Sequence, residues 1–176
     1  ASGQYAVGAG LALYLALAYQ MPWYVCMIAA MIGGGLLGGI AGILKAYLNV
    51  NEVIAGIMLN WISLYSVNML LTNVKESSTT YTMALKTNSP DALIPSLGLD
   101  KLFSDNRYVT IAIPLAVIIA ILVWVVMSKT KLGYELKATG LNKNAAKYAG
   151  MKEKRNMILT MVIAGCLAGL GAAFLY

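Results

Sequence analysis

Four long stretches of the chain carry no charged residue, and they set the expected architecture. They cover residues 1–44, 53–74, 108–128 and 156–176. A bilayer core takes about 20 apolar residues per helix. The first stretch is long enough for two helices, and it is interrupted at Gln20-Met21-Pro22, where a tight turn is expected. The pattern therefore predicts five spans, at about residues 5–19, 23–44, 53–72, 109–127 and 157–176.

The predicted fold is an all-α, polytopic transmembrane helix bundle that forms one domain over residues 1–176. The segment at 5–19 is short and rich in glycine, so it is either a tilted or a re-entrant span. A signal peptide is the other alternative, but no basic region precedes it and a second span follows directly. The chain lacks an initiator Met and its last span runs to Tyr176, so we expect a fragment of a longer membrane protein.

Composition agrees with a membrane protein and excludes several kinds of chemistry. Apolar residues make up 60% of the chain, charged residues only 11%, and the mean hydropathy is +0.72. The chain has two cysteines and no histidine, which excludes zinc fingers, disulfide frameworks and Cys–His nucleophile pairs. The five spans hold no charged residue, so an intramembrane enzyme would lack the groups for acid–base catalysis. We expect no metal, no cofactor and no catalytic residue.

The distribution of charge predicts the orientation in the membrane. Residues 129–155 hold eight basic and two acidic side chains, whereas residues 73–107 hold four of each. Cytoplasmic loops carry the excess of Lys and Arg. The segment 129–156 is therefore expected in the cytoplasm, together with the N-terminus, and the segment 73–107 outside the cell membrane. This asymmetry also accounts for the basic isoelectric point, so no nucleic-acid partner is needed.

Glycines in two of the spans favour close helix packing. The run GGGLLG that begins at Gly33 fits a dinucleotide-binding fingerprint, but it lies within an apolar span instead of following a strand. Small residues four positions apart allow two helix backbones to approach closely. The candidates for this packing are Gly34, Gly38, Gly42, Gly165 and Gly169.

The span at 53–72 is the most polar, and its polar side chains have two possible roles. Asn60, Ser63 and Ser66 lie on one side of the expected helix. They either hydrogen-bond between helices or line a pathway for a solute. Asn49 and Glu52 have the spacing of a capping box at the start of this helix, with Asn51 as an alternative cap.

A short helix is predicted within the basic segment. Asn142 is expected to cap it and Gly150 to end it. A helix of two turns is not stable alone, so either a partner or the lipid headgroups should hold it. Its candidate contact residues are Ala145, Ala146, Tyr148 and Ala149.

Several motifs resemble those of one family of membrane proteins. The run GYELKATGLN at 133–142, followed by AAKYAG at 145–150, is similar to the cytoplasmic loop of ABC importer permeases. The likeness is to the group that transports branched-chain amino acids, ribose and nucleosides. The runs NVNEVI at 49–54 and IMLN at 57–60 resemble its nucleoside and simple-sugar branch, and ASGQY at the start resembles the end of a motif of that branch.

The resemblance implies a transmembrane subunit of an ATP-driven importer. It further implies a second permease subunit, an ATP-binding subunit and an extracytoplasmic substrate-binding protein as partners. By position, the resemblance implies that the segment from Asn142 to Gly150 couples to the ATP-binding subunit. The chain has no phosphate-binding loop motif, so ATP would be hydrolysed on that other subunit. The segment 73–107 is 35 residues long, more than an ordered connection usually needs, so we predict some helix near 97–105 and a docking role for the substrate-binding protein. A permease for branched-chain amino acids or another small solute, and a scaffold that transports nothing, are the alternatives.

The orientation can be tested with single cysteines at Ser78 and Asn144. Because positively charged loops stay in the cytoplasm, a membrane-impermeant thiol reagent added outside should label position 78 and leave position 144 unlabelled. Labelling of position 144 alone would reverse the predicted topology.

Overall fold

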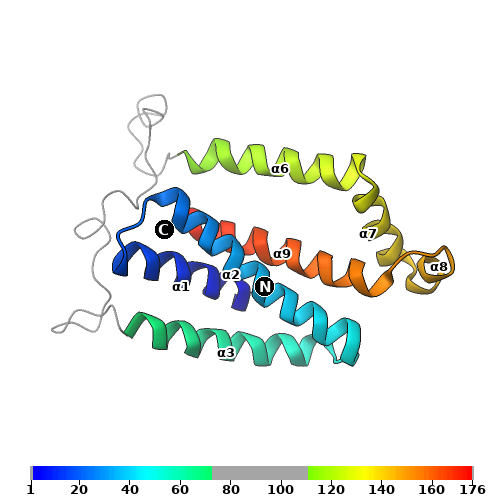
Figure 1. Ribbon diagram of the computed structural model, residues 1–176, viewed down its shortest axis with the longest axis horizontal. Helices are drawn as coiled ribbons and strands as arrows, with labels where there is room; N and C mark the ends of the chain where they lie inside the picture. Colours follow the sequence, from blue (N-terminus) through cyan, green and yellow to red (C-terminus); the bar gives the residue numbers. More distant parts are fainter. Residues whose placement is uncertain (1, 73–110, 176) are drawn as a thin grey trace. The chain divides into compact units, whose positions relative to one another are not determined.

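The described part of the chain is entirely helical. The computed structural model describes residues 2–72 and 111–175, and it has no strand in these ranges (Figure 1). The all-α fold class is therefore confirmed. The predicted external segment 73–107, including the helix expected near 97–105, lies outside the described residues. The helices are α1 (Ser2–Ala18), α2 (Trp23–Leu48), α3 (Glu52–Thr72), α6 (Ala112–Lys129), α7 (Lys131–Leu141), α8 (Lys143–Tyr148) and α9 (Glu153–Leu175).

Four of these helices, α2, α3, α6 and α9, are long and apolar enough to cross a membrane. The span expected at 5–19 forms α1, which has 17 residues. At a rise of about 1.5 Å per residue it is about 26 Å long, somewhat less than the roughly 30 Å of a bilayer core. The described residues thus supply four candidate spans and one shorter apolar helix, where the hydropathy pattern predicted five spans.

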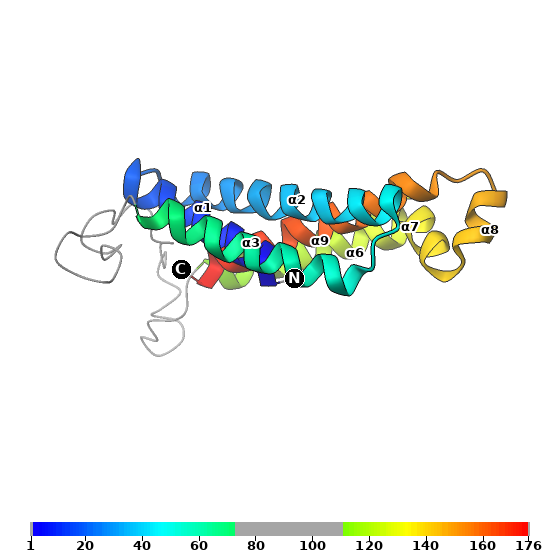
Figure 2. The ribbon, with the colours of Figure 1, turned by 90° about the horizontal axis from the view of Figure 1, so that it is seen from below.

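The helices fall into two compact units, which are described separately. The first contains α1, α2, α3 and the part of α9 from Met157 onward, and the described residues of the second are 111–156. Within the first unit α1 touches each of the other helices. Gly3 lies against Asn60 of α3, and Gly8 lies against Gly169 of α9. Leu11 extends from α1 toward Gly33 of α2. In Figures 1 and 2, α1 runs alongside α2 and α3.

Glycines also bring α2 and α9 into backbone contact. A Cβ atom added at Gly34 would collide with the carbonyl oxygen of Gly165. Further along α2, a Cβ at Gly38 would collide with the carbonyl oxygen of Met161, and one at Gly42 would lie 3.0 Å from Cα of Ile158. Because Gly34, Gly38 and Gly42 are four residues apart, they form a strip without side chains along α2, and this glycine strip packs directly on α9. From the α9 side, Gly169 lies against Ala30 of α2.

The turn between α2 and α3 corrects one prediction. Asn49 ends α2 in the left-handed conformation (φ 49°) and does not begin α3, so the capping box of Asn49 and Glu52 is wrong. The alternative cap is present, because the side-chain oxygen of Asn51 accepts a hydrogen bond of 3.0 Å from the amide of Val53. Glu52 is the first residue of α3, and its carboxylate pairs with Lys45 at 2.8 Å across the turn.

The contact between α2 and α9 can be tested with a single added methyl group. Gly165→Ala should lower the free energy of unfolding by about 1–3 kcal/mol, because the new methyl group has to displace backbone atoms. Gly171→Ala is the matched control on the same helix, since no atom lies within 4 Å of its added Cβ. Thermal unfolding of the detergent-solubilised protein, followed by circular dichroism, measures both. Equal stability of the two variants would contradict the close contact.

Candidate functional site

The basic segment begins with a sharp corner between α6 and α7. Thr130 separates the two helices, and its hydroxyl donates to the carbonyl oxygen of Val126 at 2.5 Å while accepting from the amide of Gly133 at 3.3 Å. Gly133 is buried, and a Cβ there would collide with the carbonyl oxygens of Val126 and Met127. The chain can therefore leave the end of α6 and start α7 at once only with glycine at this position.

Helix α7 was not anticipated from the sequence, which predicted a single short helix within the basic segment. Gly133 and Gly140 lower the helix propensity of this stretch and hide it. The signal that could have revealed α7 is Thr130, a good N-cap residue directly after the end of an apolar span. With α7 present, the short helix α8 is held by a neighbouring helix in the same unit.

Asn142 joins α7 to α8, as its predicted role as a cap requires. Its backbone amide donates to the carbonyl oxygen of Ala138 at the end of α7. Its side-chain oxygen accepts hydrogen bonds of 3.1 Å from the amides of both Asn144 and Ala145 at the start of α8. A single extended residue therefore ends one helix and begins the next, which fixes the angle between them.

Gly150 ends α8, also as predicted, and it does so in a specific pattern. It adopts φ +76°, in the left-handed region that glycine occupies without strain. Its amide donates to the carbonyl oxygen of Lys147, and the amide of Met151 donates to that of Ala146, each at 3.0 Å. These two bonds form a Schellman motif, which satisfies the last carbonyl groups of the helix and turns the chain toward α9.

A buried asparagine fastens the start of α9 to α7. Asn156 is only 2% exposed, and its side-chain amide donates to the hydroxyl of Thr139 at 3.1 Å. That hydroxyl in turn donates to the carbonyl oxygen of Glu135, one turn earlier in α7. Sequence reasoning missed Asn156, because it stands at the edge of an apolar span where a polar residue is unremarkable.

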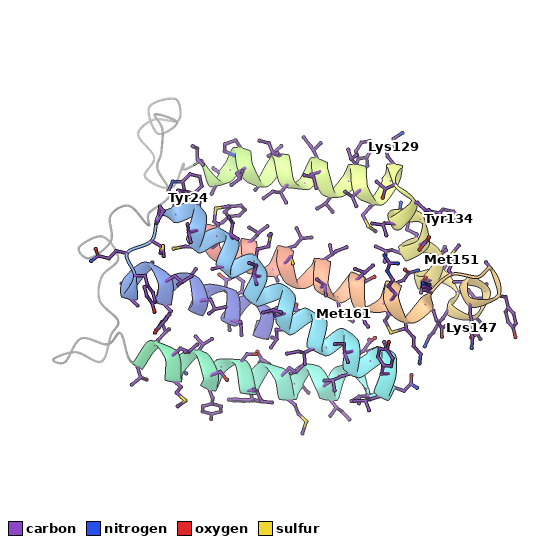
Figure 3. The ribbon with its side chains drawn as sticks, in the orientation of Figure 1. Tyr24, Lys129, Tyr134, Lys147, Met151 and Met161 are labelled. Atoms are coloured by element: carbon purple, nitrogen blue, oxygen red, sulfur yellow. The ribbon has the colours of Figure 1, made fainter. Side chains whose placement is uncertain are left out.

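The outer surface of α8 is small and apolar. Ala145 and Ala149 are exposed, and Tyr148 is 92% exposed, as is Leu141 at 89% just before the helix. Ala146 is different, because it is only 3% exposed and lies on the inner side of α8. Lys147 extends from the outer side of the helix (Figure 3). Of the predicted contact residues, Ala145, Tyr148 and Ala149 are thus available to a partner, whereas Ala146 supports the helix from within.

The three polar residues of α3 occupy different environments. Ser63 is 2% exposed, and its hydroxyl donates to the carbonyl oxygen of Leu59 at 2.6 Å. The side-chain oxygen of Asn60 accepts a 2.9 Å hydrogen bond from Ser2 of α1, and Asn60 lines a cavity of about 50 Å³ together with Gln4. Ser66 is exposed. Asn60 and Ser63 therefore face α1, and Ser66 does not share their environment.

Taken together, these features define an all-helical membrane protein with a capped, exposed helix between two membrane-length helices, α6 and α9. Among the described residues, no three His, Cys, Asp or Glu side chains are grouped so that they could hold a metal ion. The chain belongs to the family described as the permease component of the branched-chain amino acid transport system, whose model matches residues 1–176.

The chain is also similar to several individual permeases. The guanosine ABC transporter permease protein NupP of Bacillus subtilis is 35% identical over 175 residues, which cover 97% of this chain and 49% of NupP. The nucleoside ABC transporter permease protein NupB of Lactococcus lactis is 37% identical over 155 residues, with coverages of 82% and 40%.

A sugar permease is similar at a somewhat lower level. The galactose/methyl galactoside import permease protein MglC of Haemophilus influenzae is 32% identical over 152 residues, which cover 86% of this chain and 43% of MglC. The chain thus spans about half, or less, of the length of these relatives. No solved structure matches it.

The cap on α8 can be tested by Asn142→Ala. Loss of an N-cap side chain costs about 1 kcal/mol, so the amides of α8 should exchange with deuterium about fivefold faster. Asn144→Ala is the matched control, because its side chain is exposed and does not cap the helix. Hydrogen exchange measured by mass spectrometry on peptides that cover residues 142–151 gives the answer. Unchanged exchange in Asn142→Ala would show that tertiary contacts alone hold α8.

Proposed function

We propose that the chain forms the transmembrane part of a permease subunit of an ATP-driven importer for nucleosides or simple sugars. ATP would be hydrolysed by a separate ATP-binding subunit, and a second permease subunit and an extracytoplasmic substrate-binding protein would complete the transporter. Family membership and the names of the relatives support this function. Because two relatives are described as nucleoside or guanosine permeases, nucleosides are the preferred substrates, ahead of branched-chain amino acids.

In this proposal residues 129–155 lie in the cytoplasm, and the protein is a multi-pass protein of the cell membrane. The eight basic residues of this segment support that orientation. The segment 73–107 then lies outside, where it would meet the substrate-binding protein.

The observation that carries the proposal is the exposed outer surface of α8. Small side chains at Ala145 and Ala149 leave room for a partner to approach the helix closely, and Tyr148 offers an aromatic anchor of the kind enriched at the energetic centres of interfaces. Lys143 and Lys147 flank this surface and would guide an acidic partner toward it, which affects the rate of association more than its strength.

The connections of α8 explain how movement of a partner would reach the membrane. Asn142 holds one end of α8 on α7, which follows α6 through the tight corner at Gly133. The Schellman motif holds its other end on the turn into α9, and Asn156 fixes that helix to α7. A displacement of α8 would therefore move α7 with it and act on the ends of both α6 and α9.

Ala145→Glu and Ala149→Glu test this coupling. A buried carboxylate at the contact should weaken association with the ATP-binding subunit by about 2 kcal/mol or more, roughly 30-fold. Substrate-stimulated ATP hydrolysis by the assembled transporter should fall accordingly, with membrane abundance unchanged. Ala145→Ser and Ala149→Ser keep the side chains small and serve as controls that should retain activity. If the Glu variants hydrolyse ATP and transport at the original rates, α8 is a surface loop facing the headgroups.

We further propose that Asn60, Ser63 and Ser66 contribute to the translocation pathway, with Asn60 as the principal residue. The support is that Asn60 and Gln4 bring two side-chain amides to the same small cavity, where they could hydrogen-bond a hydroxyl or a base edge. The bond from Ser2 to Asn60 and the burial of Ser63 favour the other role, hydrogen bonding between α1 and α3.

Asn60→Leu separates the two roles. If Asn60 lies on the pathway, the variant should lose most of its uptake of labelled nucleoside while it keeps its abundance in the membrane. Asn68→Leu makes the same change at an exposed site on α3 and should keep both. A parallel fall in uptake and abundance for Asn60→Leu would mean that Asn60 acts only in helix packing.

A further inference from the structure

The second unit contains a cavity whose lining residues, apart from Ala149 and Gly150, have no part in the proposed function. Its volume is about 370 Å³, within the range of small-molecule sites. Its walls come from three places: α7, the turn that follows α8, and the first turn of α9. Tyr134 on α7 and Met151 on the turn are two of its lining residues, and Figure 3 shows them close together.

The charge around this cavity favours an anion. Lys131, Lys152 and Arg155 line it, against one carboxylate, that of Glu135. The nearest approach of Lys131 to Glu135 is 4.0 Å, and the lysine side chain is 90% exposed, so this pair is weak. In the described part of the chain, neither Lys152 nor Arg155 lies within ion-pair distance of a carboxylate. Two cations are thus uncompensated at the cavity wall.

The surrounding groups suit a phosphate in particular. Arg155 presents a planar fork of donors that matches two phosphate oxygens, and the ammonium group of a lysine can approach a third. The phenol of Tyr134 supplies another hydroxyl donor. Because the cavity opens beside the first turn of the 23-residue helix α9, the positive end of the helix dipole adds to the attraction.

The position along the chain relates the cavity to the membrane surface. Lys131 stands two residues after the end of α6, and Arg155 stands two residues before the apolar part of α9 begins. Both helices are long and apolar enough to span a bilayer. If α6 and α9 span the membrane, Lys131 and Arg155 flank the points where the chain would leave and re-enter it, which is where phospholipid headgroups would lie.

We propose, on the basis of the orientation proposed above, that this cavity binds the phosphate of an anionic phospholipid of the cytoplasmic leaflet. Basic pockets beside transmembrane helices on the cytoplasmic side are suited to such headgroups. Met151 gives the cavity an apolar side for the glycerol backbone, and Glu135 can accept a hydrogen bond from a headgroup hydroxyl. A bound headgroup would bridge α7 and the start of α9, the same two helices that Asn156 and Thr139 join.

Lipid titration of the purified full-length permease tests the site directly. Native mass spectrometry counts bound phosphatidylglycerol, with phosphatidylcholine as the neutral comparison and inorganic phosphate as a soluble competitor. Lys152→Gln with Arg155→Gln removes two cavity cations and should lower the apparent affinity for phosphatidylglycerol by about 30-fold. Arg155→Lys keeps the charge but loses the planar fork, and it should give an intermediate loss.

The matched control is Lys129→Gln with Lys137→Gln. It removes the same charge from the same segment at two exposed positions outside the cavity, so affinity should change by less than about threefold. Equal losses of lipid affinity in both double variants would mean that the basic segment attracts anionic lipid only through its overall charge. That result would overturn the proposal.

Two further outcomes would also overturn it. Displacement of phosphatidylglycerol by millimolar inorganic phosphate, with equal binding of that ion, would identify a soluble phosphate as the ligand. Unchanged lipid binding in the cavity variant, with loss of binding to the ATP-binding subunit, would show that the cavity receives an acidic side chain of a partner. The lipid measurement needs neither ATP nor transport, so it stands even if the proposed coupling role of α8 fails.

Discussion

The arrangement of the first unit depends on the absence of side chains where α1, α2 and α9 touch. Gly34 and Gly165 lie so close that neither could carry a Cβ. A Cβ at Gly8 would collide with Gly169, and one at Gly169 would collide with the carbonyl oxygen of Ala30. Between membrane helices there is no hydrophobic effect to draw apolar surfaces together, so close van der Waals packing has to supply the attraction. Backbones that approach without intervening side chains maximise those contacts. The glycine strips therefore decide which helices pair, and they do so without any charged group in the spans.

The second unit achieves rigidity by a different device, the capping of short helices. Helix α8 has six residues, too few to be stable alone. It persists because its free backbone groups are satisfied at both ends, by Asn142 at the start and by the Schellman motif at the end. Asn142 also ends α7, and the Schellman motif leads into the turn before α9. The bonds that stabilise α8 therefore also connect it to both neighbouring helices. The proposed coupling to a separate ATP-binding subunit would require a connection of this kind.

The cavity at the start of α9 and the outer surface of α8 lie in the same basic segment, yet they suit different ligands. The surface of α8 is small and apolar, with lysines at its border, which favours a protein partner. The cavity is lined by cations and lies next to the ends of membrane-length helices, which favours a lipid phosphate. In the two proposals together, part of the positive charge that predicts the orientation also binds lipid.

The sequence alone determined the features that rest on composition and local bonding. Apolar stretches predicted the positions of α2, α3, α6 and α9, and the identities of Asn142 and Gly150 predicted both ends of α8, because capping depends on neighbouring residues only. The capping box at Asn49 failed, since the local pattern could not show that this residue ends α2. Only the tertiary structure showed α7, the bond between Asn156 and Thr139, and the burial of Ala146 and Ser63. The bond and the two burials depend on residues from different helices coming together, and the pattern of a single segment does not contain that information. Helix α7 was missed for a local reason, because Gly133 and Gly140 lower its helix propensity.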